Sequence, residues 1–261
     1  MNISINIPSW KRPNDVKTLN YIPFARVYVD IDEADEYKKN YPNADIVACP
    51  KGVQGNLCRV RNYIIDQELN VNKRDAALIV DDDLNKIERY IYRDGYGYER
   101  EKVETDELMI FIEKYSLLAK ELGAKFWGIN CYSDAMAFRH FSPFSTVSYI
   151  GGPFQCFLQG NECYYDEKLP LKEDYDMTLQ QLNKERVVLR VNGYHYICRQ
   201  SEQIGGCAMY RNRQREREQL ELLQHKWGGG IVKIDKTNKG KSRKEKYEDY
   251  NPIIKPPIKG I

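Results

Sequence analysis

The chain has 261 residues, of which 42% are hydrophobic and 30% are charged, and its formal net charge is +2. This length fits one large domain or two small ones, and this composition is typical of a soluble globular protein. No apolar run approaches the roughly 20 residues that span a bilayer, and no signal peptide opens the chain, so we expect a cytoplasmic protein with no membrane partner.

The first part of the chain alternates between strand and helix patterns. Three isoleucines alternate with polar residues in residues 1–7, which predicts a strand. Apolar residues at helical spacing predict a helix over residues 57–69. We also expect a polar helix at residues 32–41 and strands at residues 25–29, 45–48 and 78–80.

The second part begins with residues 90–102, whose Tyr, Gly and charged residues predict an irregular insertion. Helices are then expected at residues 106–122, 173–182 and 211–225. Strands are expected at residues 126–131, 154–158 and 187–191, the last of them continuing toward residues 194–198. From Lys233 onward the chain is rich in Lys and Pro and has no core pattern. We therefore expect one folded domain over residues 1–230 and a basic, Pro-rich tail over residues 231–261.

Strands that alternate with helices predict an α/β fold with a mostly parallel sheet flanked by helices. Such sheets bind ligands beyond the carboxyl ends of their strands. Three polar turns lie at such ends, namely Pro8-Ser9, Lys51-Gly52 and Asp81-Asp82-Asp83. Their convergence at one edge is stronger evidence for a site than any one of them.

The acid triplet is the most informative of these turns. Three adjacent carboxylates repel one another and need a counter-charge. Mg²⁺ and Mn²⁺ take oxygen ligands and often bind through one or two carboxylates plus substrate phosphates. In a strand Asp81 and Asp83 point to one side and Asp82 to the other, so the pair could hold a metal that in turn holds a diphosphate.

Further motifs follow in a fixed order. Arg61-Asn62 lies on the helix before the triplet, and Gly151-Gly152 and Glu173-Asp174-Tyr175-Asp176 come after it. Together these motifs resemble the nucleotide-sugar glycosyltransferases of the GT-A fold, family 2 type, over roughly residues 1–200. Val60 stands where that family has Ala in its Ala-Arg-Asn helix. The compact layout and basic end also resemble the phage TET-associated glycosyltransferases, which modify oxidised DNA bases.

The resemblance implies a role for each matching position. Asp83 and Asp81 would bind Mn²⁺ or Mg²⁺, and Gly151 and Gly152 would let the backbone approach the acceptor. Asp174, beside Glu173, would be the catalytic base of an inverting enzyme, although acids in a first helical turn also serve as caps. The residues expected along the donor are Pro8, Ser9, Arg12, Arg61, Asp81 and Asp82.

Several residues fit two roles. His195 is a candidate third metal ligand or an ordinary strand histidine, because many GT-A enzymes place one late histidine on the metal. Arg139 and the aromatic residues around it could stack on an extruded base or belong to the core.

The chain has seven cysteines, an odd number, and no two of them form a Cys-x-x-Cys pair. This pattern favours free thiols over disulfides or a zinc site.

Charge is unevenly distributed along the chain. Residues 1–183 hold 22 Lys and Arg against 29 Asp and Glu, whereas the remainder holds 18 against 9. The dense basic runs are Arg211 to Arg217 and Lys239 to Lys246. A basic carboxyl-terminal third favours an anionic partner such as nucleic acid, and a solvated tail is the alternative.

Together with these observations, the resemblance implies a metal-dependent glycosyltransferase that uses a nucleotide sugar, expected to be a UDP-linked hexose or arabinose. The acceptor that the resemblance implies is a hydroxymethylated pyrimidine, such as hydroxymethylcytosine, in bacteriophage DNA, so we expect the protein in the host cytoplasm. A transferase acting on protein or polysaccharide is a second hypothesis. A nucleotidyltransferase is a third hypothesis. Such enzymes usually have a glycine-rich, basic loop after the first strand, and residues 8–12 contain no glycine. A nucleic-acid-binding module would leave the acid triplet unexplained.

Overall fold

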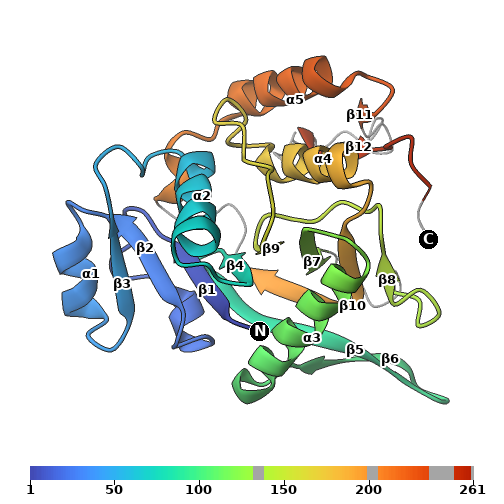
Figure 1. Cartoon of the computed structure of the whole chain (residues 1–261), viewed down its shortest axis with the longest axis horizontal. Helices are drawn as coiled ribbons and strands as arrows, with labels where there is room; N and C mark the ends of the chain where they lie inside the picture. Colours follow the sequence, from blue (N-terminus) through green and yellow to red (C-terminus); the bar gives the residue numbers. More distant parts are fainter. Residues whose placement is uncertain (132–137, 199–204, 235–249, 260–261) are drawn as a thin grey trace, which may run out of the picture.

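A computed structural model describes residues 1–131, 138–198, 205–234 and 250–259 (Figure 1). Its centre is a ten-stranded sheet of order β3-β2-β1-β4-β9-β7-β10-β5-β6, with β8 paired to β10. The strands are β1 (Ile3–Pro8), β2 (Arg26–Asp30), β3 (Asp45–Cys49), β4 (Ala76–Val80), β5 (Leu84–Arg93), β6 (Gly97–Lys102), β7 (Phe126–Asn130), β8 (Phe144–Ser145), β9 (Phe154–Leu158) and β10 (Leu189–Cys198). The two strands β11 (Val232–Ile234) and β12 (Pro252–Ile254) form a separate small sheet.

The sheet is mixed and mostly parallel, as the alternating pattern predicts. Strands β1, β2, β3 and β4 pair in parallel, and β10 pairs in parallel with β7. Strands β9, β5 and β8 run against the others. The helices are α1 (Ala34–Asn40), α2 (Leu57–Ile65), α3 (Thr105–Glu121), α4 (Glu173–Glu185) and α5 (Arg213–Trp227), and a π-helix (Asp66–Val71) extends α2.

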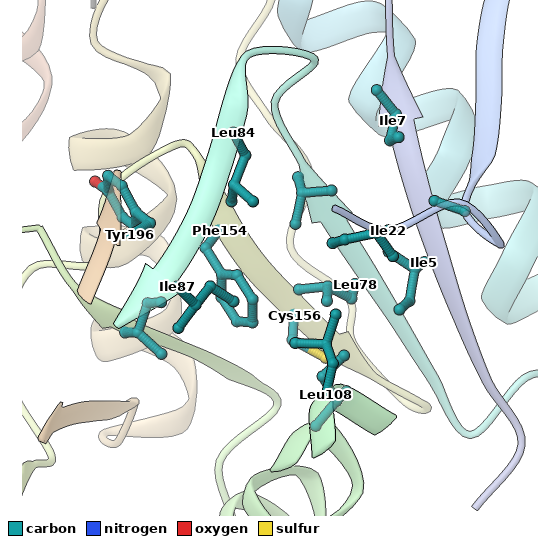
Figure 2. Packing of buried hydrophobic residues seen from close by; sticks show 14 of the residues in the cluster. Ile5, Ile7, Ile22, Leu78, Leu84, Ile87, Leu108, Phe154, Cys156 and Tyr196 are labelled. Atoms are coloured by element: carbon teal, nitrogen blue, oxygen red, sulfur yellow. The ribbon is translucent and has the colours of Figure 1, made fainter. Parts of the chain in front are cut away.

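The central strands are buried on both faces, which explains their continuous apolar runs. In β4, Leu78 and Val80 join the core on the side of α3, whereas Ala77 and Ile79 join the core on the side of α2 and α4. Figure 2 shows the first of these cores, where Leu78 lies among residues from β1, β5, β9 and α3.

One expected element is wrong. Residues 90–102 are not irregular: they continue β5 and return as β6 in an antiparallel hairpin. Gly95 and Gly97 both have a φ of +81°, a backbone conformation that glycine adopts readily and that tight hairpin turns need. The tyrosines around them are good strand formers, so the composition that suggested a loop marks a hairpin with a glycine turn.

The last described residues pack onto the domain. Val232 and Tyr250 are buried in a third cluster with Leu179 of α4 and Leu223 of α5. In Figure 1, α4 and α5 lie side by side above the sheet, next to the β11 and β12 pair. The boundary at residue 230 stays a prediction, and the Lys239 to Lys246 run lies outside the described residues.

Candidate active site

A cavity of about 620 Å³ opens at the carboxyl ends of β1 and β4. Its wall contains the turn after β1, the acid triplet after β4, the start of α4, and residues from the carboxyl-terminal part of the chain, including Arg211 and Asn251. Most of the residues that the motifs predict therefore meet in one place. The predicted residues in the wall are Pro8, Ser9, Arg12, Asp81, Asp82, Asp83, Gly152, Glu173 and Asp174.

Asp82 is the member of the triplet that bonds to the turn after β1. Its Oδ2 accepts a hydrogen bond from Ser9 Oγ at 2.8 Å, and its Oδ1 accepts one from Arg12 Nη1. Burial raises the pKa of this carboxyl to about 6, although Arg12 and Ser9 oppose the shift. The contacts of Asp82 thus fasten the turn after β1 to the end of β4.

Asp81 and Asp83 line the cavity as well. Burial, and then repulsion from Asp81 and Asp82, raise the pKa of Asp83 to about 7. The thiol of Cys198 lies beside Asp83, and 30% of the Asp81 side chain is exposed. Among the described residues, no three His, Cys, Asp or Glu side chains form a ready-made metal cage. Two carboxylates with open space beside them suit a cation that substrate phosphates help to hold.

Arg61 joins the two acidic parts of the site. Its side chain is fully buried, Nη2 donates to Asp81 Oδ1 at 2.7 Å, and Nη1 donates to Glu173 Oε1 at 3.2 Å. Nη2 also donates to the carbonyl of Gly152 at 3.1 Å. Despite this cation, burial and the neighbouring charge of Asp174 raise the pKa of Glu173 to about 8.

Asp174 is oriented by three donors. The Tyr149 hydroxyl and the Gly152 amide donate to its Oδ2, the second at 3.3 Å, and the Tyr175 amide donates to Oδ1 at 2.8 Å. The rings of Tyr149 and Tyr175 stack at 4.2 Å. The carboxylate therefore faces the cavity in a fixed orientation at the start of α4, which suits a group that accepts a proton.

The two adjacent glycines have different surroundings. A Cβ on Gly151 would lie 2.3 Å from the Tyr196 hydroxyl, so the backbone there has no room for a side chain. Gly151 lies behind the wall, whereas Gly152 is in the wall and carries the amide that contacts Asp174. A Cβ on Gly152 would meet Arg61 and Glu173 at 3.4 Å, an ordinary contact.

The structure does not bring His195 or Arg139 into the cavity wall. His195 is buried in β10, its Nε2 lies 3.2 Å from Glu88 Oε2, and burial lowers its pKa. Arg139 follows Phe138, whose ring stacks on Tyr90 of the hairpin at 4.9 Å. The predicted aromatic loop thus packs partly against the hairpin.

Sequence reasoning missed several residues of the wall. Tyr149 belongs to no motif, and Lys172 directly precedes the acid motif without being part of it. Lys172 pairs with Glu216, and Arg211, predicted as part of a basic run, lines the same wall. Tyr149 contacts Asp174 across 25 positions and Lys172 contacts Glu216 across 44, so no local pattern reveals these contacts.

The structure places one group of acids at the carboxyl end of β4 and a second acid pair at the start of α4, both in the wall of one cavity. A family model described as "TET-Associated Glycosyltransferase" matches residues 3–206. The chain belongs to this family. No curated protein sequence matches it significantly. Among the described residues of this TET-associated glycosyltransferase, no helix has both the length and the apolarity to cross a bilayer.

Solved structures resemble the chain only distantly. Residues 1–349 of TarS from S. aureus share 13% identity at a TM-score of 0.46, over 75% of this chain and 59% of that one. Glucosyl-3-phosphoglycerate synthase from Mycobacterium tuberculosis, solved with Mg²⁺ and UDP, shares 10% at 0.46, over 85% and 78%. A CMP:2-keto-3-deoxy-manno-octonic acid synthetase shares 8% at 0.44, over 86% and 100%. The chain spans less than two thirds of this TarS fragment.

Proposed function

We propose that this protein transfers a sugar from a UDP-linked donor to the hydroxymethyl group of a modified pyrimidine in DNA. The observation that carries the proposal is the meeting of Asp81 and Asp83 with Glu173 and Asp174 in one cavity, linked by the buried Arg61. The first pair suits a metal that holds a diphosphate, and the second suits removal of a proton from an acceptor hydroxyl.

The donor side consists of the triplet and the turn after β1. Asp81 and Asp83 would hold Mn²⁺ or Mg²⁺, which when bound neutralises charge that grows on the departing diphosphate. Asp82 acts indirectly, because Ser9 and Arg12 already occupy its oxygens. Pro8 and Trp10 shape the wall where the nucleoside would lie. His195 and Arg139 are not part of the proposal, because neither lines this wall.

The acceptor side consists of Gly152 and the acid pair. A hydroxyl is a poor nucleophile until a positioned base removes its proton, and Asp174 is oriented for this by Tyr149 and Gly152. Glu173 has a raised pKa, contacts Arg61 and is adjacent to Asp174. Its protonation state therefore changes the net charge beside the proposed base. This assignment applies to an inverting reaction.

Two observations favour DNA as the acceptor. The family is described as TET-associated, and TET chemistry concerns oxidised bases in DNA. The chain also concentrates its positive charge after residue 183. Lys and Arg bind phosphates without reading sequence, so an acidic catalytic body can still retain a polyanion through its basic end.

A donor screen tests the proposal. The protein is incubated with Mn²⁺ or Mg²⁺ and a panel of nucleotide sugars, with and without DNA that contains hydroxymethylcytosine, and released nucleoside diphosphate and modified DNA are measured. We expect release that depends on UDP-sugar, metal and modified DNA together. Transfer to a protein or polysaccharide, with none to DNA, would replace the acceptor and keep the transferase. Incorporation of a nucleotide from a nucleoside triphosphate would favour a nucleotidyltransferase.

A further inference from the structure

A second charged cluster lies in the cavity wall, where the residue before α4 meets α5. Lys172 Nζ donates to Glu216 Oε2 at 2.5 Å, and Glu216 Oε1 lies 2.9 Å from Arg211 Nε. Lys172 also donates to Asn251 Oδ1 at 3.3 Å, which ties the last described segment to this cluster. All four residues line the cavity.

The cluster holds one more positive than negative charge. Lys172 and Glu216 are almost fully buried, with side chains 1% and 3% exposed, so they form the fixed part. Arg211 is 30% exposed and is the member that can reach a ligand. The guanidinium fork of Arg211 matches the oxygens of a phosphate, which would give its exposed part a partner in addition to Glu216.

The position of Arg211 distinguishes two phosphates that could occupy the site. Arg211 pairs with Glu216, and Glu216 pairs with Lys172, the residue directly before Glu173 and Asp174 of α4. Although burial alone would lower the pKa of Arg211, the nearby charge of Glu216, and then of Glu173 and Asp174, raises it. Arg12, in contrast, pairs with Asp82 of the triplet. Arg211 therefore adjoins the proposed base, whereas the donor diphosphate is expected beside the triplet.

We infer that Arg211, held by Glu216 and Lys172, binds a phosphate of the acceptor nucleotide. The inference rests on the proposed transfer to a base in DNA and adds that the enzyme recognises a nucleotide rather than a free nucleoside. The cluster fixes the phosphate of the target nucleotide while its hydroxymethyl group approaches Asp174. A donor phosphate is the competing occupant, and the experiment below separates the two.

The test compares three acceptors with the wild type, Arg211→Gln, Arg211→Lys and a control, Arg93→Gln. Arg93 lies on the β5–β6 hairpin with its side chain 60% exposed, so the control removes the same charge outside the cavity. The acceptors are a hydroxymethylcytosine oligonucleotide, its nucleoside 5′-monophosphate and the free nucleoside. We expect Arg211→Gln to raise KM for the oligonucleotide and the monophosphate about tenfold or more, because hydrogen bonds to charged groups are strong.

KM for the free nucleoside and the affinity for UDP should change less than twofold, and Arg211→Lys should recover part of the loss. An equal rise of KM for all three acceptors would overturn the inference, and weaker UDP binding would assign the cluster to the donor. If the wild type modifies no acceptor, the proposed function fails separately. The cluster is then tested by fluorescence anisotropy with a labelled hexanucleotide: tenfold weaker binding by Arg211→Gln than by Arg93→Gln supports it, and equal binding overturns it.

Discussion

Arg61 Nη1 donates to Glu173 Oε1 at 3.2 Å, a buried contact that joins α2 to the first residue of α4. The same guanidinium bonds to Asp81, so one side chain couples the proposed donor and acceptor sides. Removing it would leave the Asp81 carboxylate without its cation and the Glu173 carboxyl without its donor. The geometry of the site therefore depends on a residue that need not touch either substrate.

Replacing Arg61 by Met should destabilise the fold strongly. Breaking a buried pair by removing one partner typically costs about 3–5 kcal/mol, because the remaining charge is uncompensated. Arg59→Met is the matched control, since Arg59 pairs with Glu167 on the surface and such pairs contribute about 0–1 kcal/mol. Urea denaturation measures both. Similar losses of unfolding free energy in the two variants would contradict the central role of Arg61.

Asp83→Asn and Asp82→Asn should have opposite signatures. Asp83 is repelled by its neighbours, so its loss should leave the melting temperature unchanged or higher while metal-dependent transfer falls at least about 100-fold. Asp82 bonds to Ser9 and Arg12, so Asp82→Asn should cost about 1–3 kcal/mol of stability. Thermal unfolding, transfer assays and calorimetric titration with Mn²⁺ and UDP distinguish them. Full activity of Asp83→Asn, or of the wild type in chelator, would reject the metal site.

Asp174→Asn tests the catalytic base. The substitution keeps the size of the side chain and removes proton acceptance, so turnover should fall about 10²–10⁴-fold with nearly unchanged donor affinity. Tyr149→Phe, which removes one donor to Asp174, should lower turnover less. The anomeric configuration of the product, read by NMR, completes the test. An unchanged rate would leave Asp174 as a helix-start residue, and a retained configuration would remove the need for this base.

The sequence predicts the site best where the chemistry is local. The triplet after β4 is read directly from an apolar run that ends in acids, and alternation separates Asp82 from its two neighbours. The partners of these residues are not local: Arg12 meets Asp82 across 70 positions, and Lys172 meets Glu216 across 44. Such pairs depend on how the sheet brings its strand ends together. The sequence does not distinguish the β5–β6 hairpin from a loop, because Gly and Tyr are common both in loops and in hairpins with a glycine turn.

The raised pKa of Glu173 makes stability depend on pH in a defined direction. The pKa rises from 4.5 to about 8 in the folded state, so between these values the unfolded chain binds fewer protons. The free energy of unfolding should therefore fall as pH rises from about 5 to 8, by at most about 1.4 kcal/mol for each step of one in pH. Glu173→Gln should flatten this dependence, whereas exposed Glu121→Gln should not. Urea denaturation at three pH values measures it, and equal slopes would contradict it.

DNA retention by the basic carboxyl-terminal third is the last prediction. Deleting residues 236–261 would also remove Tyr250 and Asn251, which pack against the domain and Lys172, so substitution is the cleaner test. Replacing Lys239, Lys241, Lys244 and Lys246 by Gln should weaken duplex binding and reduce its salt dependence, because each phosphate contact releases counterions. UDP affinity and metal-dependent donor hydrolysis should stay unchanged, since the acid triplet lies in the cavity wall.

The measurement is a salt titration of duplex binding, with Lys38, Lys39, Lys114 and Lys120 replaced by Gln as a control for charge alone. Equal salt slopes for both variants would show that the Lys239 to Lys246 run does not contribute to DNA binding. Salt-insensitive or absent binding by the wild type would favour a protein or polysaccharide acceptor.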